Sequence, residues 1–199
     1  DASGMSCLLS LRRMNQIEKI DPAARLVQCG AGVILQNLHE AVAAQDMRFP
    51  LTLGGKGSAT IGGLVSTNAG GTQVLRHGTM RALVAGLQAV MPDGSIFDGL
   101  TPLKKDNRGY DLKHLLIGAE GTIGIVTKAT LHLVPALIER SVAWVAVDNP
   151  TAAYQLLLAA NDAFPSMLEG FEILPDAALR HVQKHIPGTR DPLGTVYAW

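Results

Sequence analysis

The sequence predicts an α+β fold with a mixed or antiparallel sheet, and three observations support this prediction. Short apolar runs rich in β-branched residues alternate with a stretch of helical periodicity, in which Ile34, Leu38 and Val42 repeat every four residues. A Pro-Asp-Gly-Ser turn at residues 92–95 separates two strand-like runs, as in a β-hairpin. Glycine accounts for 21 of the 199 residues and is concentrated in a few segments.

The expected elements fall into two groups along the chain. In the first group, strand-like runs cover residues 5–11, 25–29, 83–91, 96–97 and 123–134, and helix-like runs cover residues 33–44 and 111–116. In the second group, which begins after Pro135, strand-like runs cover residues 142–147, 168–174 and 196–199, and helix-like runs cover residues 151–160 and 176–185. The sequence therefore predicts two domains, residues 1–135 and residues 136–199.

Charge and cysteine content argue against several functional classes. The 17 Lys and Arg residues balance 17 Asp and Glu residues, so no nucleic-acid partner is expected. The longest apolar runs are far shorter than the ~20 residues that span a bilayer, so no transmembrane segment is expected. Cys7 and Cys29 form neither a CxxC pair nor a zinc pattern. We interpret both as buried small apolar groups and predict a cytoplasmic location.

Residues 54–71 hold seven glycines, interleaved with Ser58, Thr60 and Asn68 among other small polar residues. Glycine lets a ligand approach the backbone closely, and exposed amides and hydroxyls can hydrogen-bond phosphate, ribose or ring heteroatoms. The order at residues 60–63 is expected to direct free N–H groups at such a ligand. The alternative is a flexible surface loop, although linkers rarely contain the aliphatic residues found here.

Other motifs do not fit. A P-loop needs Ser or Thr after its lysine, where Gly57 stands. Residues 30–35 approach the dinucleotide fingerprint, but Leu35 replaces its third glycine. The motifs GxSxG and HExxH are absent from the sequence. His181 and His185 would share a helix face but have no third ligand at suitable spacing, so no metal site is predicted.

A second glycine turn at residues 118–127 leads directly into a strand. Together with residues 54–71, it resembles the FAD-linked oxidase family, which has the PCMH-type FAD-binding fold. The resemblance is to the branch of D-lactate, glycolate and D-2-hydroxyglutarate dehydrogenases. It is strong over residues 5–135 and weak over residues 136–199. Similar family segments match residues 75–78, 92–94 and 107–112.

The resemblance implies that residues 1–135 form the second subdomain of an FAD-binding domain, and that residues 136–199 begin an α+β cap domain. It also implies FAD as the cofactor. By motif position, the cofactor-binding residues would be Pro50, Gly54, Gly55, Ser58, Thr60, Ile61, Gly62, Gly63, Asn68, Gly70, Gly71, Glu120, Gly121, Gly124, Ile125 and Val126. This assignment requires residues 54–71 and 118–126 to meet in space.

The implied activity is oxidation of a small D-2-hydroxy acid by hydride transfer to flavin N5, with an unknown electron acceptor. Two alternatives stay open: another FAD-dependent oxidase or reductase of the same fold, and a non-catalytic nucleotide-binding module. A homodimer is the expected assembly. The family's pyrophosphate loop would precede Asp1, and its catalytic base and metal-binding histidines would follow Trp199. We therefore interpret the chain as a fragment, inactive alone, and assign no catalytic residue within it.

Overall fold

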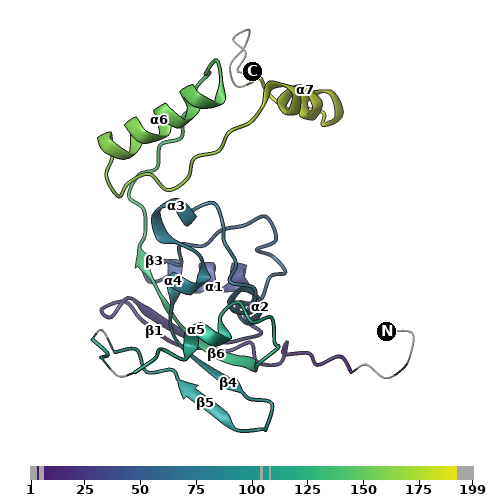
Figure 1. The fold of residues 1–199 in the computed structure, drawn as a ribbon, viewed down its shortest axis with the longest axis vertical. Helices are drawn as coiled ribbons and strands as arrows, with labels where there is room; N and C mark the ends of the chain where they lie inside the picture. Colours follow the sequence, from purple (N-terminus) through teal and green to yellow (C-terminus); the bar gives the residue numbers. More distant parts are fainter. Residues whose placement is uncertain (1–3, 5–6, 104, 108, 192–199) are drawn as a thin grey trace. The chain divides into compact units, whose positions relative to one another are not determined.

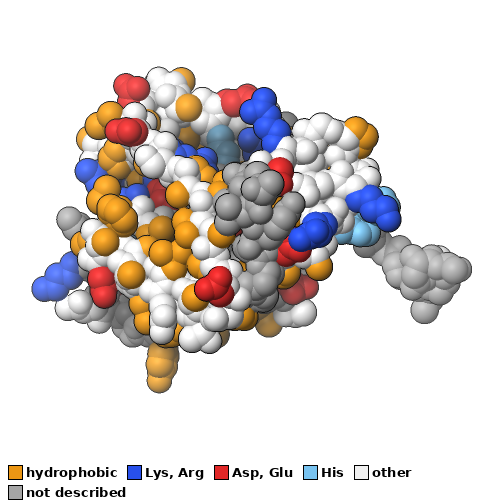
Figure 2. Space-filling model, turned by 90° about the horizontal axis from the view of Figure 1, so that it is seen from above, with side chains coloured by type: hydrophobic (Ala, Val, Ile, Leu, Met, Phe, Trp, Pro, Cys, Tyr) orange, Lys and Arg blue, Asp and Glu red, His pale blue; other side chains and the backbone are white. Residues whose placement is uncertain are grey.

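The computed structural model describes residue 4 and residues 7–103, 105–107 and 109–191. The chain divides into two units, Asp1–Ala136 and Leu137–Trp199, which are considered separately. Figure 1 shows the sheet and the helices of the first unit. In the part of the chain described, no helix is long and apolar enough to cross a membrane. On the face drawn in Figure 2, basic and acidic side chains are interspersed.

A five-stranded sheet with the order β1-β2-β6-β4-β5 forms the centre of the first unit. Its strands are β1 (Ile17–Asp21), β2 (Leu26–Gly30), β4 (Val84–Val90), β5 (Ile96–Gly99) and β6 (Ile125–His132). Each neighbouring pair in this sheet is antiparallel, as the sequence predicted. A second ladder joins β3 (Met47–Arg48) to β7 (Val134–Pro135), so the chain leaves β6 and pairs again at once.

Both hairpins are closed by an aspartate that accepts hydrogen bonds from the turn backbone. Asp21 Oδ1 accepts from the Ala24 N–H at 2.9 Å, between β1 and β2. Asp93 Oδ1 accepts from the Ser95 N–H at 2.9 Å, between β4 and β5. Gly94 follows Asp93 with φ 83°, a left-handed conformation that glycine adopts without steric cost. Local sequence is therefore sufficient to specify both turns.

Among the described residues of this unit, the helices are α1 (Leu35–Ala43), α2 (Ile61–Ser66), α3 (Val74–His77), α4 (Met80–Leu83) and α5 (Lys113–Leu116). The helix predicted over residues 33–44 is confirmed as α1, and it buries the apolar stripe that Leu38 and Val42 form. The helix predicted over residues 111–116 is confirmed in shorter form as α5. Asp111 does not cap it; its carboxylate pairs with Lys113 and His114 instead.

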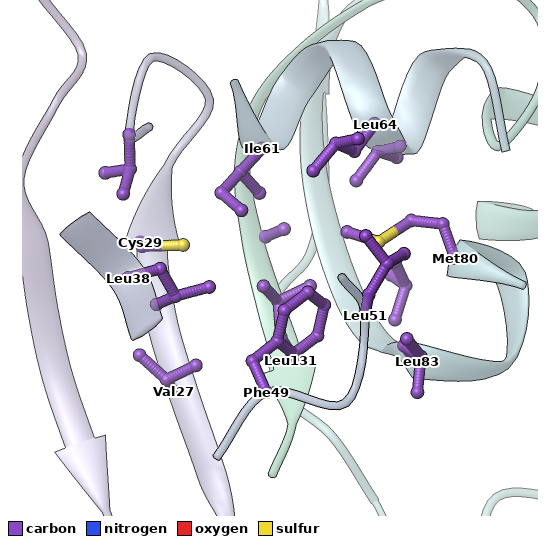
Figure 3. Packing of buried hydrophobic residues seen from close by; sticks show 14 of the residues in the cluster. Val27, Cys29, Leu38, Phe49, Leu51, Ile61, Leu64, Met80, Leu83 and Leu131 are labelled. Carbon is purple, nitrogen blue, oxygen red and sulfur yellow. The ribbon is translucent and has the colours of Figure 1, made fainter. Parts of the chain in front are cut away.

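The core lies between one face of the sheet and α1, α2 and α4 (Figure 3). Strand register directs Cys29, Ala129 and Leu87 to the same face, because Ala129 is paired with both neighbours. Leu38 and Ile61, each fully buried, cover these residues from α1 and α2. The core therefore ties the glycine-rich helix α2 directly to β6.

The opposite face of the sheet is largely polar. Gln28 is paired with both Lys19 and Thr130, so their side chains share that face. A cavity of about 300 Å³ lies there, lined by residues that include Lys19, Gln28, Asp98 and Thr130. None of the predicted cofactor-binding residues lines this cavity.

The first strand was predicted in the wrong place. Residues 7–11 are not a strand, and Leu8 and Leu9 are 95% and 67% exposed; residues 5 and 6 lie outside the described residues. The strand is instead β1, which directly precedes the Asp21-Pro22 turn and can therefore pair with β2. The segment before β1 lies along residues 30–32, where the Gly32 N–H donates to the Met14 carbonyl at 2.9 Å.

The second unit contains α6 (Pro150–Ala163) and α7 (Asp176–His185), and both predicted helices are confirmed. Asn149 caps α6, since its Oδ1 accepts from the Ala152 N–H at 2.9 Å, and Pro150 occupies the first turn. The strands predicted at residues 142–147 and 168–174 are wrong for the described residues, because neither run is hydrogen-bonded into a sheet there. The strand predicted at residues 196–199 lies outside the described residues.

The two cysteines differ in environment, and the prediction that both are buried is wrong for Cys7. Cys7 is exposed, whereas Cys29 is fully buried in β2. Burial, with a smaller contribution from the Glu18 charge, raises the pKa of the Cys29 thiol to about 12. Cys7 lies in the segment before β1, whereas Cys29 lies within the sheet.

We expect a thiol reagent to modify Cys7 promptly and Cys29 only on unfolding, because the thiolate is the reactive form and Cys29 is both neutral and inaccessible. Thiol titration in native buffer and in denaturant measures this difference. The variant Cys7→Ser should show almost no reactive thiol in native buffer and one in denaturant. Rapid native labelling of Cys7→Ser would contradict the prediction.

Candidate functional site

The two glycine-rich stretches meet in space. The Gly118 N–H donates to the Val65 carbonyl at 3.1 Å, and the Glu120 N–H donates to the Ser66 carbonyl at 2.9 Å. Val65 and Ser66 form the last turn of α2, whose final carbonyls have no partners within the helix. The turn at residues 118–121 supplies a partner for the Ser66 carbonyl and a second one for the Val65 carbonyl, which also accepts from the Asn68 N–H at 3.1 Å. The contact between residues 54–71 and 118–126 that the sequence analysis required is therefore present.

The start of α2 does not present free N–H groups, contrary to the sequence prediction. The Ile61 N–H donates to the Val33 carbonyl at 2.8 Å, and the Gly62 N–H donates to the Ala31 carbonyl at 2.7 Å. The Gly63 N–H is taken by the Thr60 side chain at 3.4 Å. These donors are used because α2 packs directly on the segment that connects β2 to α1. The sequence pattern carries no sign of this docking.

The exposed backbone lies instead in the loop at residues 54–58. Gly54, Gly55, Gly57 and Ser58 are exposed, and a Cβ added to Gly54 would meet nothing within 4 Å. Among the described residues, no hydrogen bond engages the N–H groups of these three glycines. The loop turns on itself through the Ser58 N–H, which donates to the Gly55 carbonyl at 3.0 Å. It therefore offers bare backbone to a ligand.

Two side chains fix the base of this loop. Thr52 is held twice by Gln73: its N–H donates to Gln73 Oε1 at 2.8 Å, and its hydroxyl accepts from Gln73 Nε2 at 3.1 Å. The Thr72 N–H donates to the Thr52 carbonyl at 3.0 Å. From α1, His39 Nε2 lies 3.0 Å from the Leu51 carbonyl, to which it donates. A rigid base with an open tip suits a binding loop, since little order is lost when a ligand arrives.

Several glycines in the motif serve chain packing. A Cβ on Gly62 would lie 2.6 Å from the Ala31 Cβ, and a Cβ on Gly71 would lie 2.3 Å from the Thr52 carbonyl oxygen. A Cβ on Gly124 would lie 2.8 Å from Leu116 Cδ2. These glycines are required for close approach within the protein. Composition alone does not distinguish these glycines from the open ones.

The structure sorts the predicted site residues by exposure. Gly54, Gly55, Ser58, Gly63, Gly70, Glu120 and Gly121 are exposed, Thr60, Asn68, Gly71 and Ile125 are half-buried, and Pro50, Ile61, Gly62, Gly124 and Val126 are buried. Glu120 and Asn68 have φ of 50° and 48°, in the left-handed region that side chains rarely adopt. Both strained residues lie where the two stretches touch.

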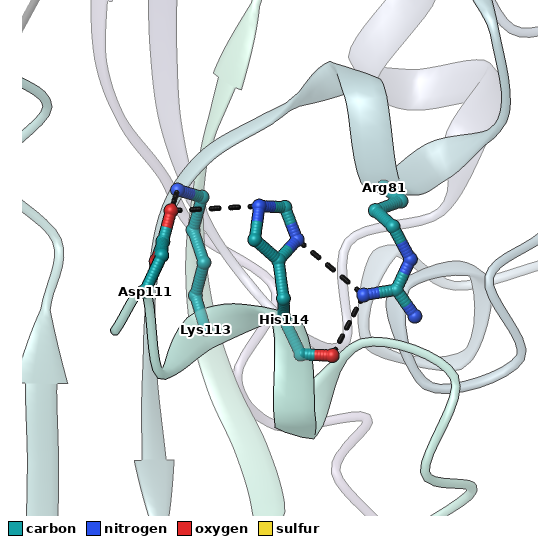
Figure 4. A network of polar contacts seen from close by, with 4 residues as sticks. All are labelled: Arg81, Asp111, Lys113 and His114. Carbon is teal, nitrogen blue, oxygen red and sulfur yellow. Dashed lines mark hydrogen bonds and ion pairs between the residues drawn. The ribbon is translucent and has the colours of Figure 1, made fainter. Parts of the chain in front are cut away.

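Arg81 is a residue of this site that sequence reasoning missed (Figure 4). Its N–H donates to Asn68 Oδ1 at 2.9 Å. Its guanidinium donates to the carbonyls of His114 and Ile117, each at 2.6 Å. No short motif marks Arg81, because its partners are 13, 33 and 36 residues away.

His39 gives the loop base a predicted pH dependence. Burial lowers the pKa of His39, and the hydrogen bond to the Leu51 carbonyl opposes that shift only in part. Below its unfolded pKa, near 6.5, the unfolded chain takes up a proton that the folded chain refuses. The stability associated with neutral His39 is therefore lost as pH falls from about 7 to 5.

We expect thermal unfolding curves recorded across that range to show a steeper fall in Tm for the wild type than for His39→Gln. The glutamine amide can still donate to the Leu51 carbonyl but does not titrate. Equal pH slopes in the two proteins would show that His39 does not contribute to the dependence.

Comparison with known proteins connects the site to a known family. A family described as "FAD binding domain" matches residues 2–99, which include the whole 54–71 stretch. The chain is similar to this family over those residues. Its five-stranded antiparallel sheet with flanking helices is the PCMH-type FAD-binding fold. Within the described residues, no group of three or more His, Cys, Asp or Glu could hold a metal ion.

The relatives of this chain are much longer than it is. It is 39% identical over 188 residues to a protein of Arabidopsis thaliana named mitochondrial D-2-hydroxyglutarate dehydrogenase, covering 94% of this chain and 34% of that protein. It is 35% identical over 186 residues to a Saccharomyces cerevisiae protein named D-2-hydroxyglutarate–pyruvate transhydrogenase, covering 94% and 38%. The chain thus spans about a third of the length of these relatives.

A solved structure of alkyldihydroxyacetonephosphate synthase shares the fold. Its TM-score is 0.62 at 21% sequence identity, and the match covers 78% of this chain and 30% of that structure.

Two observations show that the described residues fit FAD. The loop at residues 54–58 exposes its backbone, and because Gly54 has no Cβ to cover it, a flat ring or a phosphate has room to approach. The turn at Gly121 (φ 80°) is exposed beside α2 and adds a second bare backbone surface. FAD is the cofactor of this domain family.

Proposed function

We propose that this chain is part of an FAD-dependent oxidoreductase that oxidises a D-2-hydroxy acid. The single observation that carries the proposal is the contact between the two glycine stretches, through the hydrogen bonds of Gly118 and Glu120 to the end of α2. The Arabidopsis thaliana and Saccharomyces cerevisiae relatives described above are both named for D-2-hydroxyglutarate, which favours that substrate over D-lactate and glycolate.

In this proposal the chain binds and orients the cofactor. Gly54, Gly55, Ser58 and Gly121 would hold FAD through backbone and hydroxyl groups, because these residues are exposed while their neighbours anchor them. The buried members of the motif, such as Ile61 and Val126, would support the site from the core. When bound, FAD supplies the acceptor for the hydride that leaves the substrate Cα. We assign no catalytic base among the described residues.

Domain roles, assembly and location follow as further proposals. Residues 1–135 would be the FAD-binding domain and residues 136–199 the beginning of the cap that covers the substrate. The expected assembly is a homodimer. We predict a cytoplasmic location from the cysteine content, whereas the Arabidopsis thaliana relative carries a mitochondrial name.

The test is made on the full-length protein that contains this chain. We expect it to purify with visible flavin absorbance that is bleached anaerobically by D-2-hydroxyglutarate, and more slowly or not at all by the L enantiomer, which serves as the control. Bleaching by D-lactate or glycolate alone would redirect the substrate assignment within the same class. A protein that binds FAD but is bleached by no 2-hydroxy acid would favour another FAD-dependent enzyme. A protein that purifies without FAD would favour the remaining alternative, a non-catalytic nucleotide-binding module.

A further inference from the structure

Arg81 makes hydrogen bonds to the first glycine stretch and to the residues that directly precede the second. It belongs to the short helix α4, which leads directly into β4. Its main-chain N–H donates to Asn68 Oδ1 at 2.9 Å, which ties α4 to the end of the first stretch. Its side chain reaches the other way, to the His114 carbonyl in α5 (Figure 4) and to the carbonyl of Ile117, the residue before the second stretch.

The guanidinium binds the carboxyl end of α5. Nη1 donates to the His114 carbonyl and Nη2 to the Ile117 carbonyl, each at 2.6 Å. Carbonyls at the end of a helix have no partners within it, and a cation there also interacts favourably with the helix dipole. A guanidinium offers several N–H donors in a rigid planar fork, so it can bind two carbonyls at once. Nη1 also lies 3.4 Å from His114 Nδ1.

The next residue after Ile117 is Gly118, whose N–H donates to the Val65 carbonyl. An added Cβ at Gly118 would lie 3.3 Å from the Asn68 Cβ and 3.4 Å from Arg81 Nη2, so the three groups are in close contact. Glu120 has φ 50°, a left-handed conformation that a side chain rarely adopts, so the turn needs support from its surroundings. Arg81 supplies part of that support, because it bonds the carbonyl just before the turn and Asn68 beside it.

We propose that Arg81 is a positioning residue that holds the turn at residues 118–121 against α2 and Asn68, in the arrangement that receives the flavin. This inference rests on the proposed function and extends it to a residue outside both glycine motifs. Arg81 acts through the turn. Lysine does not replace it, because a single ammonium cannot bind both carbonyls in the geometry of the fork.

The decisive readout is amide hydrogen exchange, measured on the protein without flavin. In Arg81→Lys we expect exchange at the Gly118 and Glu120 N–H groups to accelerate about tenfold or more, the size expected when hydrogen bonds from a charged donor are lost. Exchange in the paired strands β4 and β6 should stay within about twofold, since Arg81 makes no bond to either ladder. Arg81→Gln, which keeps one short amide donor, should behave like Arg81→Lys.

The second readout is the dissociation constant for FAD of the full-length protein. We expect it to rise about tenfold in Arg81→Lys and Arg81→Gln, with a changed visible flavin spectrum, because the turn no longer holds one position. The matched control is Lys19→Ala, which removes an ion pair with Asp21 (3.3 Å) in β1, at the edge of the sheet. The control should change neither the exchange at Gly118 and Glu120 nor FAD affinity.

Three results would overturn the inference. Unchanged exchange at Gly118 and Glu120 in both variants would show that Arg81 does not hold the turn. Faster exchange throughout the sheet to the same degree would show a general effect on stability. A wild type that binds FAD, with variants that bind it equally well, would show that the position of the turn does not matter to the flavin. A wild type that binds no FAD would instead contradict the proposed function itself, while the exchange data would still report on the turn.

Discussion

Replacement of Phe49 by alanine is expected to lower the free energy of unfolding by about 3–5 kcal/mol, the range observed when a large aromatic side chain is removed from a core. Phe49 is the largest of the fully buried side chains and is 2% exposed. It packs among residues of α1, α2 and the sheet (Figure 3), so the surrounding elements cannot all move in to fill the space.

The effect should extend to the candidate site. Phe49 immediately precedes Pro50 and lies a few residues before the loop at residues 54–58. The centre of its ring is 6.5 Å from that of His39, which donates a hydrogen bond to the Leu51 carbonyl. Loss of the ring therefore removes support from the base of the loop. We expect the dissociation constant for FAD of the full-length protein to increase along with the loss of stability.

Urea unfolding followed by circular dichroism measures the stability change, with an unchanged m-value as evidence that the same transition is compared. Tyr110→Ala is the matched control, because Tyr110 is an aromatic residue of the same unit that is 96% exposed. Its effect should remain within about 0.5 kcal/mol. Similar losses in the two variants would contradict the role assigned to Phe49.

Elements with strong local signals were predictable from the sequence. The four-residue repeat of Ile34, Leu38 and Val42 predicted α1, and α1 buries Leu38 and Val42. The Pro-Asp-Gly-Ser turn predicted the β4–β5 hairpin, since Asp93 and Gly94 satisfy that turn with their own side chain and backbone freedom. In both cases the residues that determine the structure are close together in the sequence.

Features set by distant partners were not predictable in the same way. The β3–β7 ladder has only two residue pairs, so neither strand shows an alternating pattern. Strand β1 was displaced because residues 7–11 are more apolar than residues 17–21, although only the latter adjoin the turn that closes a hairpin. The role of Arg81 depends on partners in α5 and at Asn68, and periodicity contains no information about such contacts.

The glycine-rich segment shows the same limit in another form. The prediction that residues 54–71 meet residues 118–126 was correct, but six of the seven glycines in residues 54–71 were all assigned to the cofactor. In the structure Gly54 is open, whereas Gly71 lies against the backbone of Thr52. Two glycines of one motif therefore have different physical reasons to be glycine, and this difference can be measured.

Gly71→Ala is expected to lower the free energy of unfolding by about 1–3 kcal/mol, the usual cost of overpacking. The new Cβ would lie 2.3 Å from the Thr52 carbonyl oxygen and 3.0 Å from the Thr52 nitrogen. These are backbone atoms and cannot rotate away. The two chain segments, at Thr52 and at Gly71, must therefore move apart. This movement would break the hydrogen bond from the Thr72 N–H to the Thr52 carbonyl and strain the two hydrogen bonds between Thr52 and Gln73.

Gly54→Ala is the matched variant within the same motif. Its Cβ would meet no atom within 4 Å, so the substitution has no steric cost in the protein. It should leave stability unchanged or raise it by about 0.4–1 kcal/mol, because alanine restricts the unfolded chain. If the backbone at Gly54 receives the flavin, the same methyl group should weaken FAD binding by the full-length protein.

The two variants therefore separate packing from ligand binding. Chemical unfolding and FAD titration of both proteins should show loss of stability in Gly71→Ala, and loss of FAD affinity without loss of stability in Gly54→Ala. If Gly54→Ala binds FAD as tightly as the wild type, the flavin does not approach this loop at Gly54. If Gly71→Ala is as stable as the wild type, the loops at Thr52 and Gly71 are not held together as tightly as their hydrogen bonds indicate.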